Sequence, residues 1–148
     1  MNILFVVMSH ILTQAQKDDF TNKYGETSFV TLQEVNPELS KQCQQVDPSA
    51  SLVDILKLAG EVVECAADNN ATHFYCVGEP TLTMWANIYA DNTLNVSFCE
   101  YPIMGSNFRG MKCVQSTTER TSVDEVQPDG SIKKMSIFSH VQWREIFQ

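Results

Sequence analysis

Three short polar segments of this sequence carry hydroxyl, imidazole, carboxylate and guanidinium groups directly after apolar runs. Ser9 and His10 follow "ILFVVM", and "GEPTLT" (78–83) follows "HFYCV". The third segment, "STTER" (116–120), follows "GMKCVQ". If the apolar runs are parallel strands, the segments meet at one sheet edge, where α/β proteins bind ligands beside unpaired helix N-terminal amides. The sequence therefore predicts one site built from three strand ends.

The first and third segments carry groups that suit a phosphorylated ligand. Arg120 is the strongest candidate for a phosphate contact, because a guanidinium can form paired hydrogen bonds with phosphate oxygens. Its alternative role is a salt bridge with Glu119 or Asp124. His10 can donate to a phosphate or act as a general acid or base, or it can be purely structural. The hydroxyls that we expect either to bind the ligand or to be ordinary strand-end groups belong to Ser9, Ser116, Thr117 and Thr118.

The segment "GEPTLT" joins a predicted strand to a predicted helix. Gly78 would let a ligand approach the backbone closely, and Pro80 sets the backbone angle at the start of the helix. Thr81 and Thr83 offer hydroxyl groups. Glu79 would repel a phosphate, so we expect it to accept from an adenine amine or a ribose hydroxyl, or to act as a base. The alternative is an acidic first-turn residue that interacts with the helix dipole, and both remain open.

Hydrophobic periodicity and turn signals predict the elements that position these groups. The T-x-x-Q capping box of Thr13 and Gln16 begins a helix that ends at Gly25. Apolar residues at 3, 4 and 7 spacing predict a second helix after Ser49 or Ser51, and a third begins near Pro80. Residues 33–50 are polar and contain two prolines, which predicts an irregular crossover that can include a short helical turn. The predicted strands are "ILFVVM", 28–32, "HFYCVG" and "GMKCVQ".

The order of these elements predicts one α/β domain over residues 1–148. We expect a Rossmann-like, mostly parallel sheet with helices on both faces and a C-terminal β-hairpin over 121–147, which turns at "PDG". Residues 93–108 are interpreted as an inserted strand or a lid loop over the ligand, with Gly105, Ser106 and Gly110 as hinges. Arg109 or Lys112 would reach a phosphate. In the final strand, we expect His140 and Arg144 to face solvent or a dimer partner.

Composition narrows the functional classes. The chain has 148 residues, a formal net charge of −8 and five cysteines without a C-x-x-C pair. The acidity argues against a duplex nucleic-acid partner, although residues 106–148 hold six Lys and Arg against five Asp and Glu. The cysteine pattern predicts reduced thiols, no disulfide framework and no metal site. No apolar run approaches the roughly 20 residues of a membrane span, so we expect no membrane partner and a cytoplasmic protein.

Taken together, "SHILTQAQ" (9–16), "GEPTLT" and "STTERTSVDEVQPDGSIKKMSIFSHVQWREI" (116–146) resemble the small stand-alone CRISPR-associated ring nucleases of the Csx type. Their fold is related to the CARF domain, and the resemblance is closest to the Csx group with serial number twenty. It does not extend over residues 33–50 and 93–108. The resemblance implies a homodimer that binds a cyclic oligoadenylate, most simply the four-adenylate ring, across its two-fold axis.

The same resemblance implies cleavage without a metal or other cofactor. The ribose 2′-hydroxyl attacks the adjacent phosphate in line and leaves a linear product with a 2′,3′-cyclic phosphate, so the protein must mainly orient the ribose and stabilise charge. We expect catalytic roles for Ser9, His10, Glu79, Thr118 and Arg120. We expect ligand contacts from Gly78, Pro80, Thr81, Thr83, Ser116 and Thr117.

Two alternative functions remain open. The first is a sensor or sponge that binds the same ring without turnover, since such a protein needs the same hydroxyls and arginine. The second is a generic nucleotide-binding domain. Against the second, "SHILTQ" stands after the first strand, where a dinucleotide-binding domain would carry G-x-G-x-x-G.

Overall fold

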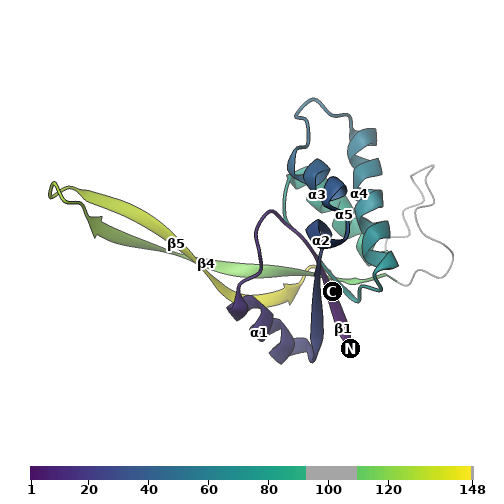
Figure 1. Cartoon of the computed structure of the whole chain (residues 1–148), viewed down its shortest axis with the longest axis horizontal. Coiled ribbons are helices and arrows are strands. Elements are labelled where there is room, and N and C mark those ends of the chain that lie inside the picture. The colour runs from purple at the N-terminus through teal and green to yellow at the C-terminus, as the bar shows by residue number, and fades with distance from the viewer. Residues whose placement is uncertain (93–109, 148) are drawn as a thin grey trace.

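The computed structural model describes residues 1–92 and 110–147 of the chain. The strands are β1 (Asn2–Val7), β2 (Thr27–Thr31), β3 (His73–Cys76), β4 (Lys112–Val126) and β5 (Ile132–Glu145). The helices are α1 (Gln14–Tyr24), α2 (Leu32–Val35), α3 (Pro37–Gln44), α4 (Leu52–Asp68) and α5 (Pro80–Asp91). They build the mixed α/β architecture of Figure 1.

The five strands form one mixed sheet in the order β2-β1-β3-β4-β5. β1 pairs in parallel with β2 and β3, and β3 pairs in parallel with β4. β5 alone runs antiparallel, against β4. The expected parallel arrangement of the first four strands and the antiparallel addition at the C-terminus are confirmed.

Helices cover both faces of the sheet, as predicted. Alternate residues of β1 point to opposite sides, so Phe5 packs into the core under α4 and α5 while Leu4 packs on the side of α1. The ring of Phe5 stacks on Phe74 of β3 with centroids 6.5 Å apart. On the other face, Phe20 of α1 meets the ring of Trp143 edge-on at 5.3 Å. Both Phe20 and Trp143 are fully buried, so the C-terminal end of β5 is packed firmly against the body of the protein.

Side-chain caps account for the ends of the main helices. The capping box of Thr13 and Gln16 is present, and Gly25 ends α1 with a φ of 98°, which favours glycine. Ser51 caps α4 by accepting from the amide of Asp54. The prediction for 33–50 was wrong in detail, because this stretch forms two helices. Asn36 accepts from the amide of Leu39 and Pro37 occupies the first turn, which is a strong start signal even in a polar segment.

The C-terminal hairpin is longer than expected. The strand end predicted at "STTER" is not there, because β4 continues through this segment to Val126 and pairs with β5 as far as Glu145. The outer parts of the two strands, residues 117–126 and 132–141, extend away from the body (Figure 1), and we call them the ribbon. The "PDG" turn is confirmed at its tip, where Gly130 has a φ of 86°. A β-bulge between Thr117 and Thr118 marks the base of the ribbon.

The predicted insertion at 93–108 lies outside the described residues. Its flanking residues Asn92 and Gly110 lie at the end of α5 and just before β4. Lys112 pairs with His73, the first residue of β3, and its ammonium lies 3.8 Å from the carboxylate of Glu145. The expectation that Lys112 reaches a phosphate was therefore wrong, because it lies at the amino end of the parallel strands and the predicted site lies at the carboxyl end. No helix in the described parts is both long and apolar enough to cross a membrane.

Candidate functional site

Three adjoining hollows follow the carboxyl ends of the parallel strands, and we call them together the edge groove. The first, of about 380 Å³, lies between the ends of β1 and β3 and the first turn of α5. The second, of about 360 Å³, lies between β3, α5 and β4 and shares Gly78 and Thr83 with the first. The third, of about 460 Å³, lies over the ends of β1 and β2 and shares Ser9 and Gln44 with the first. The edge groove is therefore a continuous row.

The segment after β1 contributes to the groove as predicted. Ser9 and His10 are both exposed, Ser9 lines the first and third hollows, and His10 lines the third. Lys17 of α1 lines the same hollow and lies over the ring of Phe29, with its ammonium 5.7 Å from the ring centroid. Sequence reasoning missed Lys17. The third hollow thus holds a lysine and a histidine that can bind an anion, together with one carboxylate, that of Glu34.

"GEPTLT" also lies in the groove, but its amides are not free. Glu79 is the N-cap of α5, and its carboxylate accepts from the amide of Thr81 at 3.1 Å and of Leu82 at 2.7 Å. These bonds, the one from Leu82 first, lower the pKa of Glu79 below its ordinary value. The expected unpaired helix N-terminus was therefore wrong, because a carboxylate of the chain already occupies it. Glu79 still lines the first hollow, where its remaining lone pairs can accept from a hydroxyl or amine.

Of the other residues of that segment, Gly78, Pro80 and Thr83 line the edge groove as expected, and Thr81 does not. Pro80 occupies the first turn of α5 and lines the second hollow. Thr83 lines the first two hollows, while Thr81 lies toward a neighbouring depression beside Ala50. A Cβ built on Gly78 meets nothing within 4 Å, so the room beside its backbone is open.

The third predicted segment contributes only its first residue to the groove. Ser116 lines the second hollow. Thr117 bonds across the hairpin, its hydroxyl donating to the carbonyl of Gln142 at 3.1 Å. Thr118 and Arg120 lie exposed on the ribbon. The prediction that they meet Ser9 and Gly78 at one sheet edge of the same chain was wrong. An extended strand rises by about 3.3 Å per residue, so Arg120 lies roughly 13 Å beyond Ser116 along the ribbon.

Arg120 is held by its own ribbon. Its guanidinium donates to the hydroxyl of Ser136 at 3.1 and 2.8 Å and lies 5.8 Å from the ring centroid of Phe138. Neither alternative salt bridge, to Glu119 or to Asp124, is among the ion pairs of the described residues. Arg120 therefore lies on the ribbon, away from the edge groove of its own chain.

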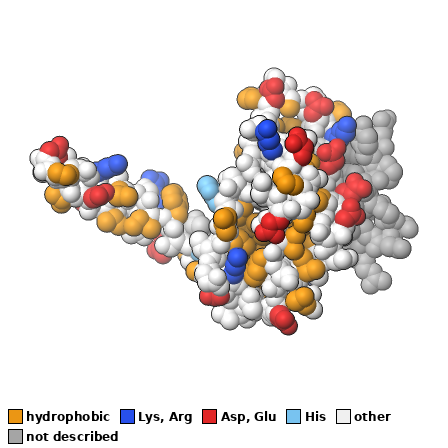
Figure 2. Space-filling model, in the orientation of Figure 1, with side chains coloured by type: hydrophobic (Ala, Val, Ile, Leu, Met, Phe, Trp, Pro, Cys, Tyr) orange, Lys and Arg blue, Asp and Glu red, His pale blue; other side chains and the backbone are white. Residues whose placement is uncertain are grey.

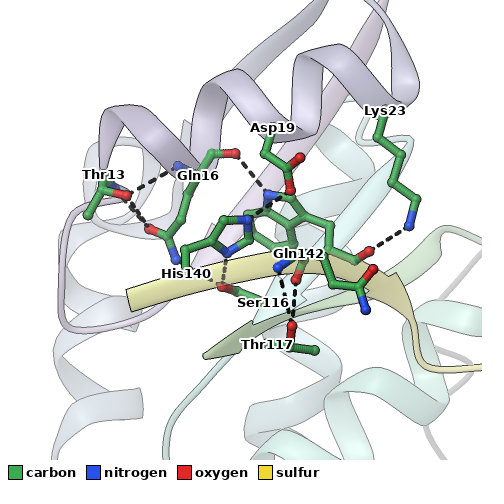
Figure 3. A network of polar contacts seen from close by, with 9 residues as sticks. Thr13, Gln16, Asp19, Lys23, Ser116, Thr117, His140 and Gln142 are labelled. Atoms are coloured by element: carbon green, nitrogen blue, oxygen red, sulfur yellow. Dashed lines mark hydrogen bonds and ion pairs between the residues drawn. The ribbon is translucent and has the colours of Figure 1, made fainter. Parts of the chain in front are cut away.

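Sequence reasoning also misplaced His140. It was expected to face solvent or a partner, yet its side chain is only 7% exposed and bonds Ser116 and Asp19 (Figure 3). The alternation of the final strand placed His140 on a definite face, but nothing local showed that α1 covers that face. Cys76 and Cys113 are buried in the core, and burial raises the pKa of each thiol to about 12.

No group of three or more His, Cys, Asp or Glu side chains within 1–92 and 110–147 is placed to hold a metal ion.

Comparison with protein families matches residues 2–144 to the uncharacterized protein MJ1673 family. The chain belongs to this family. No curated protein and no solved structure matches the chain. The matched residues include the whole ribbon and all but one of the residues that line the edge groove.

Proposed function

We propose that the chain binds a cyclic oligoadenylate in the edge groove and opens it as a metal-independent ring nuclease. The observation that carries this proposal is the row of three adjoining hollows along one sheet edge. Each has the volume of an ordinary small-molecule site, so a row of them suits a ligand with repeated units better than a single nucleotide. The parallel strands with helices on both faces also support a Rossmann-like, CARF-related domain.

The groove offers different chemistry to different parts of such a ligand. Glu79 suits an adenine amine or ribose hydroxyl, because it accepts hydrogen bonds and repels phosphate. Ser9, His10 and Lys17 suit phosphates, since they offer a hydroxyl, an imidazole and an ammonium within one hollow. In the reaction, His10 would donate to or accept from the phosphodiester while the groove holds the ribose 2′-hydroxyl in line.

Charge favours a homodimer in this proposal. Residues 1–92 hold four lysines against twelve Asp and Glu, so one body supplies few cations for a polyanionic ring. Arg120 lies on the ribbon, outside its own groove. A second copy would bring the Arg120 of its ribbon to the ring and provide the missing positive charge, which is the role we assign to Arg120 and Thr118.

The test combines cleavage and binding. Purified protein is incubated with cyclic tetra-adenylate and, separately, cyclic hexa-adenylate in EDTA, and the products are analysed by chromatography and mass spectrometry. Affinity is measured by calorimetry for the wild type, Lys17→Ala and Lys57→Ala. Lys57 is an exposed lysine of α4 and serves as a control for the loss of one positive charge. We expect Lys17→Ala to weaken binding about tenfold, a change of about 1.4 kcal/mol, and Lys57→Ala to change it little.

The outcomes separate the alternatives. Linear products with a 2′,3′-cyclic phosphate support a ring nuclease. Tight binding with intact rings identifies a sensor or sponge. Neither binding nor cleavage of either ring overturns the proposal.

A further inference from the structure

The second hollow of the edge groove differs from the other two in charge. Glu79 lines the first hollow, and Glu34 lines the third. Among the described residues, no Asp or Glu lines the second hollow, which has a volume of about 360 Å³. An anionic group therefore meets less repulsion in the second hollow than in either of the others.

Strand alternation places Gln115 on the face of the sheet that this hollow occupies. Cys113 of β4 packs into the core under α4 and α5, while Val114 packs on the side of α1. Gln115 follows Cys113 by two positions, so its side chain points to the α5 side, where it lines the hollow. Arg144 of β5 lies directly opposite Gln115, so its side chain is on the same side of the sheet.

Two hydrogen bonds join the side chains of Gln115 and Arg144. A guanidinium can only donate, so the atom of Gln115 that faces it is the carbonyl Oε1, which accepts from Nε at 2.5 Å and from Nη2 at 2.7 Å. These bonds hold the guanidinium in one plane and use two of its five N–H groups. The other N–H groups remain, and Arg144 forms none of the ion pairs found among the described residues.

The position of Arg144 leaves these N–H groups accessible. Its side chain is exposed, and Ile146, two residues further along the chain, lines the hollow together with Gln115. The guanidinium therefore lies at the rim of the hollow, bonded to a residue of its lining. A guanidinium held in plane in this way suits the paired hydrogen bonds that phosphate oxygens accept.

We propose that the second hollow is a phosphate subsite and that Arg144 is the residue that binds the phosphate. Gln115 is a positioning residue, because it acts by holding the guanidinium. The identity of the ligand rests on the proposed function: the phosphate is one of those in the cyclic oligoadenylate. Arg144 then supplies a cation to the ring from the same protomer, whereas Arg120 lies on the ribbon.

Calorimetry of the full chain with cyclic tetra-adenylate tests the role of Arg144. We expect Arg144→Gln to weaken binding at least about tenfold, the usual effect of losing a hydrogen bond to a charged group. Lys57→Gln is the matched control, because it removes one positive charge from an exposed position on α4 and should leave the affinity unchanged. Melting temperatures show whether each variant is folded.

Gln115→Glu separates a phosphate subsite from a pair that only joins two strands. The new carboxylate accepts the same two bonds from Arg144, so a purely structural pair would be kept and the affinity would not change. Beside a phosphate, the added negative charge repels the ligand. We therefore expect binding at least about tenfold weaker, with a melting temperature that does not fall. Wild-type affinity in folded Arg144→Gln or in Gln115→Glu overturns the inference and leaves the proposed function standing.

A second probe tests the subsite if the ring does not bind at all, a result that would overturn the proposed function. Adenosine 5′-monophosphate and adenosine are then titrated separately into ¹⁵N-labelled protein. The Nε–H signal of Arg144, assigned by its absence in Arg144→Gln, is followed by NMR. A shift with the monophosphate alone supports the subsite for a different phosphorylated ligand. No shift with the monophosphate, or an equal shift with adenosine, overturns the inference too.

Discussion

Glu79 caps α5 with both oxygens of its carboxylate, so its charge contributes to the stability of the fold. Its side chain accepts from the amides of Thr81 and Leu82, and these bonds lower its pKa. We expect Glu79→Ala to reduce the free energy of unfolding by about 1 kcal/mol at pH 7, the usual cost of losing an N-cap side chain. Glu79→Gln should reduce the free energy of unfolding by less, because the carbonyl oxygen of the glutamine side chain can still accept one hydrogen bond. Urea denaturation at pH 7 measures both.

The pH dependence of this effect has a definite sign. A carboxylate whose pKa is lower in the folded chain stabilises the protein above its unfolded pKa, and that contribution is lost as pH falls through the folded value. The stability difference between wild type and Glu79→Gln should therefore shrink below the ordinary glutamate value of 4.5. A difference that stays constant from pH 7 to pH 3 would show that the charge of Glu79 is not involved.

Single residues were predicted well where their signal is local and poorly where it is not. Thr13 and Gln16 form a capping box within one helical turn. Pro80 is the first residue of α5, where its fixed backbone angle favours the start of a helix. The polar run ending at Arg120 was interpreted as the end of a strand, because a ribbon with solvent on both faces lacks the apolar alternation of a half-buried strand. His140 was misplaced for the converse reason: its partner Asp19 lies 121 positions away.

At the scale of elements, the order and direction of the strands followed from the alternation of apolar runs with amphipathic segments. The helices α2 and α3 could not be predicted in this way, because they are short and lie in a polar stretch. Their existence depends on packing: Leu39 and Cys43 of α3 are buried in the same core cluster as α4. Such tertiary support cannot be read from propensity alone.

The junction between α5 and β4 gives a prediction at this scale. Gly110 has a φ of 85°, and a Cβ added to it would collide with the backbone oxygen of Asp91. The next residue, Met111, donates from its amide to the carbonyl of Ala90, so the backbone cannot easily move away. We expect Gly110→Ala to destabilise the protein by about 2 kcal/mol or more, since it combines strain with a steric clash.

Gly78→Ala is the matched control for that substitution, because its Cβ meets nothing within 4 Å and its φ lies outside the positive range. In thermal unfolding, the melting temperature of Gly110→Ala should lie several degrees below that of Gly78→Ala. Equal melting temperatures would mean that the segment around Gly110 rearranges freely. Gly78→Ala should instead act on ligand affinity, if the ligand approaches the backbone at that point.

For the molecule as a whole, the ribbon raises the question of what covers it. Both strands expose large apolar side chains there (Figure 2). Phe138 is 65% exposed and Val126 is 73% exposed. A two-stranded hairpin without a covering layer is marginally stable in water. Cross-strand pairs place Val123 opposite Met135 and Thr121 opposite Ile137 on one face, while Phe138 lies opposite Arg120 on the other. Both faces therefore offer apolar contact to another surface.

The proposed function requires a second copy of the chain, and we expect the ribbon to be the part that contacts it. We expect light scattering to give about twice the 16.7 kDa mass of one chain. The double variant Val123→Ser with Ile137→Ser should shift the equilibrium toward monomer, because it removes apolar contact from one face without changing charge. Lys133→Ser, on the same strand, should leave the mass unchanged. A wild type that stays monomeric at high concentration would contradict the dimer, and it would also remove the route by which Arg120 reaches a ring bound to another protomer.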